Sequence, residues 1–139
     1  MKLALKHSVV PNLTVEAAVV LGWVAAQWDE WEGGALGDFV VTSAKDGQHG
    51  AGSMHRHDQS EDVRGEAIDI RTWHLWHGPR EKADDVKWAD IGEHDESLHR
   101  FARFLQAHGL RVVVHPEQAE TVPHLHVAVG RESAFVRVD

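Results

Sequence analysis

Apolar residues recur along this chain with two different periods, and the longer period indicates helices. They return every three to four residues over about 14–30, with Thr14 placed as the N-cap, which predicts a helix ended by the Gly33–Gly34 pair. The same spacing predicts a second helix over about 96–108, because Gly109 follows it as a C′ residue. A short helix is also expected within the charged stretch 79–88.

The shorter period indicates strands. Runs rich in β-branched residues and alternating runs predict strands at about 39–43, 66–71, 111–115 and 125–129. In the second of these, alternation puts Asp69 on the face opposite Ile68 and Ile70. The last two strands are expected to form a hairpin.

Composition limits the architecture to a single domain. The 139 residues, 42% of them hydrophobic, suit one core, so we expect one domain over 1–139 of the α+β class, a small antiparallel sheet flanked by helices. No apolar run is long enough to cross a membrane. The first residues resemble no export signal, so synthesis in the cytoplasm is expected.

Charge and cysteine content narrow the chemistry. A net charge of -8 without a cluster of Lys or Arg argues against nucleic-acid binding. The chain has no cysteine, so it forms no disulfide, and imidazole and carboxylate groups must hold any metal ion. There are 12 histidines, and their positions rather than their number must decide their role.

Asp69 is the least expected residue, because burying a carboxylate is costly unless it is paired or bound to metal. A divalent ion would offset that cost. Pairing with Arg71 or Arg64, or simple exposure to solvent, are the alternatives that the sequence leaves open.

The predicted hairpin adds further metal-site chemistry. His124 and His126 lie two apart on a strand and therefore share a face, although a polar cross-strand face would have the same pattern. Glu120 precedes them in the loop, where a carboxylate could take a proton from a zinc-activated water. Glu117 is a rival for this role, and either residue alone is typical of a solvated loop.

Taken together, these segments resemble the hedgehog/D-Ala-D-Ala peptidase superfamily. The likeness rests on Ser53-Met54-His55, on Gly65 through Asp69 as Gly-x-Ala-x-Asp, and on His124-Leu125-His126, and it extends over about 40–130. The resemblance implies the fold of that superfamily and a zinc site made of His55, Asp69 and His126. It also implies Glu120 as general base and His124 beside the substrate or its oxyanion.

The implied activity is zinc-dependent cleavage of peptidoglycan stem peptides, as a D-Ala-D-Ala carboxypeptidase or as an endopeptidase of the phage endolysin type acting on the cell wall. A monomer is expected. The alternative is a non-catalytic binding module of the same fold in which zinc only stabilises the structure.

Two departures from the family pattern leave assignments open. The family usually has two residues between its histidine and its glycine, whereas nine residues, 56–64, separate His55 from Gly65 here, so His57 competes with His55 as the first ligand. The basic residue that often follows Thr-Ser is also missing, with only Lys45 nearby. Oxyanion support is therefore left to His124 or Lys45.

Overall fold

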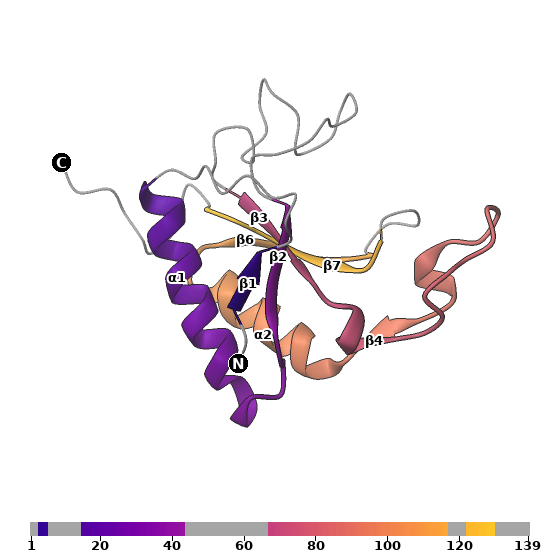
Figure 1. The fold of residues 1–139 in the computed structure, drawn as a ribbon, viewed down its shortest axis with the longest axis horizontal. Helices are drawn as coiled ribbons and strands as arrows, with labels where there is room; N and C mark the ends of the chain where they lie inside the picture. Colours follow the sequence, from indigo (N-terminus) through magenta and orange to yellow (C-terminus); the bar gives the residue numbers. More distant parts are fainter. Residues whose placement is uncertain (1–2, 6–14, 44–66, 117–121, 130–139) are drawn as a thin grey trace, which may run out of the picture.

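The computed structural model describes residues 3–5, 15–43, 67–116 and 122–129, drawn in colour in Figure 1. These residues form a mixed α+β structure with two α-helices and a five-stranded sheet. None of the helices in these four ranges is long and apolar enough to cross a membrane.

The sheet has the strand order β1-β2-β3-β7-β6. Its strands are β1 (Leu3–Leu5), β2 (Phe39–Ser43), β3 (Ala67–Arg71), β6 (Arg111–His115) and β7 (His124–Ala128). Three of the four pairings are antiparallel, and β1 lies parallel to β2 at one edge. The predicted antiparallel sheet is therefore present, and the expected hairpin of the last two strands is confirmed.

Helices α1 (Val15–Glu30) and α2 (Glu96–Ala107) pack against the same face of this sheet. Both boundaries agree with the helices that the apolar period predicts. The buried core joins side chains of the two helices to the inward residues of the sheet, namely Val20, Val24, Ala25, Trp28, Leu98, Phe101, Ala102 and Leu105 on the helices and Val41, Ile68, Ile70, Val112, Leu125 and Val127 on the strands. The opposite face of the sheet is left for polar residues.

Aromatic packing fixes the helices to the sheet. Trp28 is fully buried and meets Phe39 of β2 and Phe101 of α2 edge-on, with ring centroids 5.5 and 5.6 Å apart. Its indole N–H donates to the carbonyl of Gly37 at 2.9 Å, which satisfies the one polar atom of the ring. Trp28 is therefore a packing residue of the core.

A segment between β3 and α2 projects from the sheet, to the right in Figure 1. It contains two 3-10 turns, Trp73–Leu75 and Trp88–Asp90, and a two-stranded ladder of β4 (Trp76–His77) and β5 (Glu93–His94). The predicted helix over 79–88 is wrong, because the chain turns back at this point to pair β4 with β5.

Two parts of this projecting segment approach each other closely, and their contacts explain the turn. A Cβ added to Gly92 would lie 2.5 Å from the carbonyl oxygen of His77 and 2.5 Å from the Trp76 ring. Trp76 in turn donates its indole N–H to the carbonyl of Pro79 at 3.2 Å. The approach of Gly92 to His77 and Trp76, which are distant from it in sequence, holds the segment in a ladder rather than a helix.

Candidate metal centre

The candidate centre lies on the polar face of the sheet, where β3, β7 and β6 run side by side. The register pairs Asp69 with His126, which itself pairs with Val113, so these three side chains form one row across the strands. Arg71, His124 and His115 form the next row. The prediction that His124 and His126 share a face is confirmed, and the register places Asp69 on that same face.

The pairing register between β2 and β3 shifts next to this polar face. Val41 pairs with Ile70 whereas Ser43 pairs with Asp69, so β2 carries one extra residue between these two pairs. In a regular strand Val41 and Ser43 would point the same way, and a bulge of this kind reverses the alternation. Val41 can therefore join the core while Ser43 lies beside Asp69, and the Thr42 hydroxyl donates to the Asp69 carbonyl at 3.4 Å.

Asp69 and His126 are in direct contact. Nδ1 of His126 lies 2.8 Å from Oδ1 of Asp69, and the residues are only 3% and 8% exposed, respectively. Because the carboxylate accepts, Nδ1 of His126 is the donor in this pair. Asp69 does not face solvent, and no ion pair joins it to Arg71 in the described residues, whereas Arg64 lies outside them.

His124 approaches the same carboxylate oxygen. Its Nε2 lies 3.8 Å from Oδ1 of Asp69. Its Nδ1 lies 2.6 Å from the carbonyl oxygen of Val122, and because a carbonyl only accepts, Nδ1 must carry a proton. This hydrogen bond fixes the ring, leaving Nε2 as the nitrogen that faces the centre.

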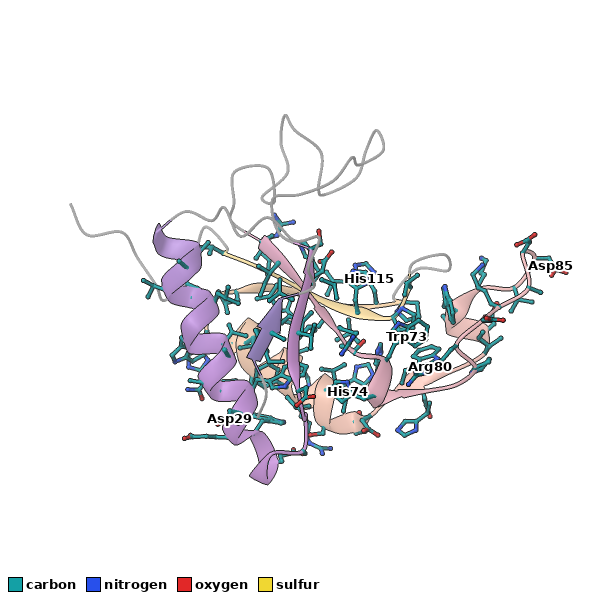
Figure 2. The ribbon with its side chains drawn as sticks, viewed as in Figure 1. Asp29, Trp73, His74, Arg80, Asp85 and His115 are labelled. Atoms are coloured by element: carbon teal, nitrogen blue, oxygen red, sulfur yellow. The ribbon has the colours of Figure 1, made fainter. Side chains whose placement is uncertain are left out.

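The His124 ring is also held from its other side. The imidazole of His115 stacks on it with ring centroids 4.4 Å apart and an interplanar angle of 23°. The two residues are direct cross-strand partners on β6 and β7. The sequence gives no sign of this role, because His115 ends an apolar run and its partner depends on the hairpin register. Figure 2 labels His115 among the side chains near β7.

The donors are of the types that zinc binds, and their separation is shorter than that of two zinc ligands. Two ligands of a tetrahedral zinc at about 2.0–2.1 Å from the ion are about 3.3 Å apart. The 2.8 Å separation of His126 Nδ1 and Asp69 Oδ1 needs only a small side-chain adjustment to reach that value, with loss of the shared proton. Within the described ranges no three His, Asp or Glu side chains are arranged to hold a metal ion by themselves.

Several predicted site residues lie outside the described residues. They are the first ligand His55 and its rival His57, the base Glu120 and its rival Glu117, and Lys45. The structure thus brings together Asp69, His124 and His126 from the predicted set. The choices among the other residues stay predictions.

A buried pair of polar side chains lies beyond the end of β3, near the candidate centre. No pattern in the sequence indicates this pair. The Thr72 hydroxyl and Nε2 of His94 are 2.7 Å apart, and both residues are buried. The pKa of His94 is lowered to about 4, mainly by burial and in addition by repulsion from His99 and His124. His94 is therefore neutral at physiological pH.

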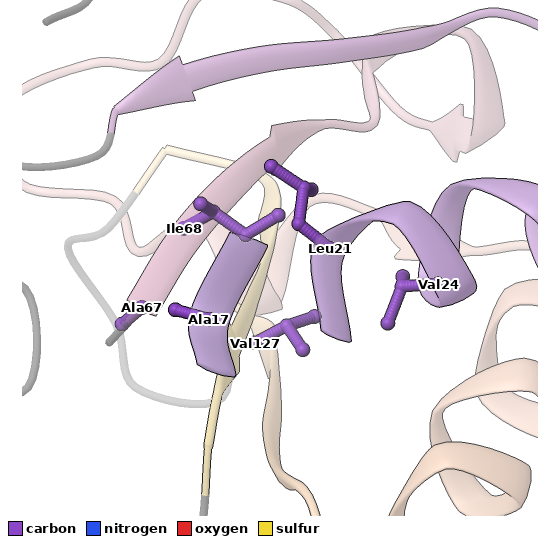
Figure 3. A pocket seen from close by; sticks show the side chains of 6 residues that line it. All are labelled: Ala17, Leu21, Val24, Ala67, Ile68 and Val127. Atoms are coloured by element: carbon purple, nitrogen blue, oxygen red, sulfur yellow. The ribbon is translucent and has the colours of Figure 1, made fainter. Parts of the chain in front are cut away.

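A small pocket elsewhere is apolar and offers no functional group. It lies between α1 and the core face of the sheet (Figure 3) and is lined by Ala17, Leu21, Val24, Ala67, Ile68 and Val127. This pocket therefore contributes no side chain to the candidate centre.

No protein-family model matches this chain, and comparisons with curated proteins and with solved structures found no match either. The likeness to the hedgehog/D-Ala-D-Ala peptidase superfamily therefore rests on the motif residues quoted above.

Proposed function

We propose that this chain is a zinc-dependent peptidase of the hedgehog/D-Ala-D-Ala peptidase type that hydrolyses peptide bonds in peptidoglycan stem peptides. The observation that carries the proposal is the convergence of two imidazole nitrogens on one oxygen of Asp69. His126 Nδ1 lies 2.8 Å and His124 Nε2 lies 3.8 Å from that oxygen. Paired nitrogen and oxygen donors on a rigid sheet are the ligands that zinc takes in catalytic sites.

In this proposal Asp69, His126 and His55 hold the metal. Zinc supplies Lewis-acid activation of water and of the scissile carbonyl group. Glu120 accepts the proton of the attacking water and returns it to the leaving amine. His124 presents Nε2 toward the reacting group because its Nδ1 proton is bound to Val122. When that nitrogen is protonated, it donates to the carbonyl oxygen as negative charge develops there.

Digestion of purified bacterial cell walls tests the activity. We expect the zinc-loaded protein to release new amino termini or free D-Ala, detected by mass spectrometry of the fragments, and a chelator to stop the release. If neither product appears from walls treated with zinc-loaded protein, the peptidase proposal is wrong.

Variants of the two candidate bases refine the assignment. Glu120→Ala should abolish hydrolysis while the zinc content stays at one ion per chain, and Glu117→Ala is the matched control that should keep activity. A protein that binds zinc stoichiometrically but cleaves no wall peptide would instead be a zinc-stabilised binding module.

A further inference from the structure

A side-chain hydrogen bond closes the projecting segment at its base. Thr72 directly follows the last residue of β3, and His94 is the last residue of β5, so the two residues mark the start and the end of the segment. The Thr72 hydroxyl oxygen and Nε2 of His94 are 2.7 Å apart. This contact therefore joins the two ends of a segment that extends away from the sheet as far as Asp85 (Figure 2).

The contact is buried. Thr72 is 0% exposed and His94 is 5% exposed, and the indole of Trp76 packs edge-on against the His94 ring with centroids 5.1 Å apart. Beside it, the Asp95 N–H donates to the carbonyl of Leu75 at 2.9 Å and continues the ladder of β4 and β5. The two ends of the segment thus enclose a small interior in which His94 has little access to water.

The groups around His94 oppose a positive charge on it. Imidazoles face it from three elements, namely His77 of β4, His99 of α2 and His124 of β7, and the carboxylate of Asp95 follows it in the chain. The rings of His94 and His99 have centroids 6.4 Å apart. Burial is the main cause that lowers the pKa of His94 to about 4, repulsion by His99 is the next, and Asp95 acts in the opposite direction.

A proton on His94 therefore favours an open segment. When the segment is open, the imidazole is in water and has its ordinary pKa of 6.5, so the open form binds the proton more tightly than the closed form. The closed form has its full advantage above about pH 6.5 and loses it as the pH falls toward 4. These two values predict that the ratio of open to closed segment rises roughly 30-fold from pH 8 to pH 5.

We propose that the contact between Thr72 and His94 is an acid-sensitive switch, which holds the projecting segment closed at neutral pH and releases it when His94 binds a proton. The base of the segment adjoins the candidate centre, because Thr72 directly follows Arg71, the cross-strand partner of His124. Opening would therefore change the surroundings of the centre while the sheet itself stays folded. This regulation goes beyond the proposed peptidase activity and does not depend on it.

Hydrogen exchange of the full chain, followed by mass spectrometry between pH 4 and pH 8, tests the proposal. Protection factors remove the intrinsic pH dependence of exchange, so they report the opening of each segment. We expect peptides that cover 73–94 to lose protection roughly 30-fold from pH 8 to pH 5, and α2 to stay better protected than the segment at every pH. A chelator is present throughout, so that loss of a metal ion in acid does not contribute.

Two variants separate the titration of His94 from the hydrogen bond. His94→Gln keeps a side chain that can bind the Thr72 hydroxyl but does not titrate, so the segment should be equally protected at pH 5 and pH 8. Thr72→Val removes the hydroxyl and should increase opening about 2- to 10-fold at pH 8. His108→Gln is the matched control, because His108 packs against Trp23 and Phe104, and it should behave like the unmutated protein.

His99→Gln is a further test that leaves both residues of the contact in place. Without the repulsion from His99, the closed form accepts a proton more readily, so the increase in opening from pH 8 to pH 5 should be smaller than in the unmutated protein.

Four results would overturn the proposal. They are a segment whose protection does not change with pH, an acid response that persists in His94→Gln, an undiminished response in His99→Gln, and equal protection of the segment and α2 at every pH. The last result would mean that acid unfolds the whole chain rather than releasing the segment.

Discussion

The imidazole rings of His115 and His124 lie nearly parallel, with centroids 4.4 Å apart, on adjacent strands that end at the same loop. Together with the hydrogen bond from His124 to Val122, this contact determines which way the His124 ring faces. A residue that is not in any motif thus helps to orient one that is.

Replacing His115 should affect turnover more than binding. Stacked aromatic pairs contribute about 0.5–1.5 kcal/mol, so His115→Ala should lower kcat for wall peptides about 2- to 10-fold, whereas His115→Phe should keep most of it. His108→Ala is a matched control, because His108 packs against Trp23 and Phe104, away from the centre. Equal kcat for His115→Ala and the unmutated protein would contradict the orienting role.

Removing the charge of Asp69 should remove the metal. Asp69→Asn keeps the shape of the side chain but lacks a full negative charge, so we expect zinc affinity to fall by at least about 10- to 100-fold, measured by competition with a chromogenic chelator. Asp85→Asn, at an exposed position in the projecting segment, should bind zinc normally. Unchanged affinity in Asp69→Asn would show that Asp69 orients His126 without binding the ion.

Stability should fall on mild acidification because of His94. Its pKa is about 4 in the folded protein, below the ordinary value of 6.5, so the unfolded chain binds the proton more tightly. The contribution of neutral His94 is thus complete above about pH 6.5 and is lost as the pH falls toward 4. From the size of this pKa difference we expect a loss of roughly 1–3 kcal/mol.

Denaturant unfolding at several pH values measures this loss. The difference in unfolding free energy between the unmutated protein and His94→Gln should shrink by that amount from pH 7 to pH 4, because glutamine does not titrate. A difference that stays constant with pH would contradict the assignment.

Two glycines should respond to alanine in opposite ways. A Cβ at Gly92 would lie 2.5 Å from the His77 carbonyl oxygen and from the Trp76 ring, so Gly92→Ala must displace backbone and should lower Tm by several degrees. A Cβ at Gly22, on the exposed side of α1, meets nothing within 4 Å. Gly22→Ala should therefore raise stability by about 0.5–1 kcal/mol. Differential scanning fluorimetry compares them, and a Gly92→Ala protein as stable as the unmutated one would refute the packing argument.

The sequence predicts best those parts of the fold that depend on a regular period. The two helices and the strands at β2, β3, β6 and β7 follow from apolar spacing alone. The alternation of side chains along β3 also places Asp69 on the face away from the core. The ladder of β4 and β5 could not be predicted, because it depends on the packing of Gly92 against Trp76, which are distant in sequence.

In the candidate site, too, some features follow from the sequence pattern and others depend on how the strands pair. Alternation predicts that His124 and His126 share a face, but only the register between strands pairs Asp69 with His126 and His115 with His124. The extra residue on β2 that places Ser43 beside Asp69 interrupts the regular alternation of the strand, so no periodic pattern in the sequence predicts it.

The residues of β7 alternate between the two layers of the molecule, with Leu125 and Val127 in the core and His124 and His126 on the polar face. Inserting one residue at the start of this strand, with the rest of the pairing kept, would exchange the two sets and bury both imidazoles among aliphatic side chains. This strand can therefore accept substitutions that alter its chemistry, whereas a change in its length would cost the protein its core and its candidate centre in one step.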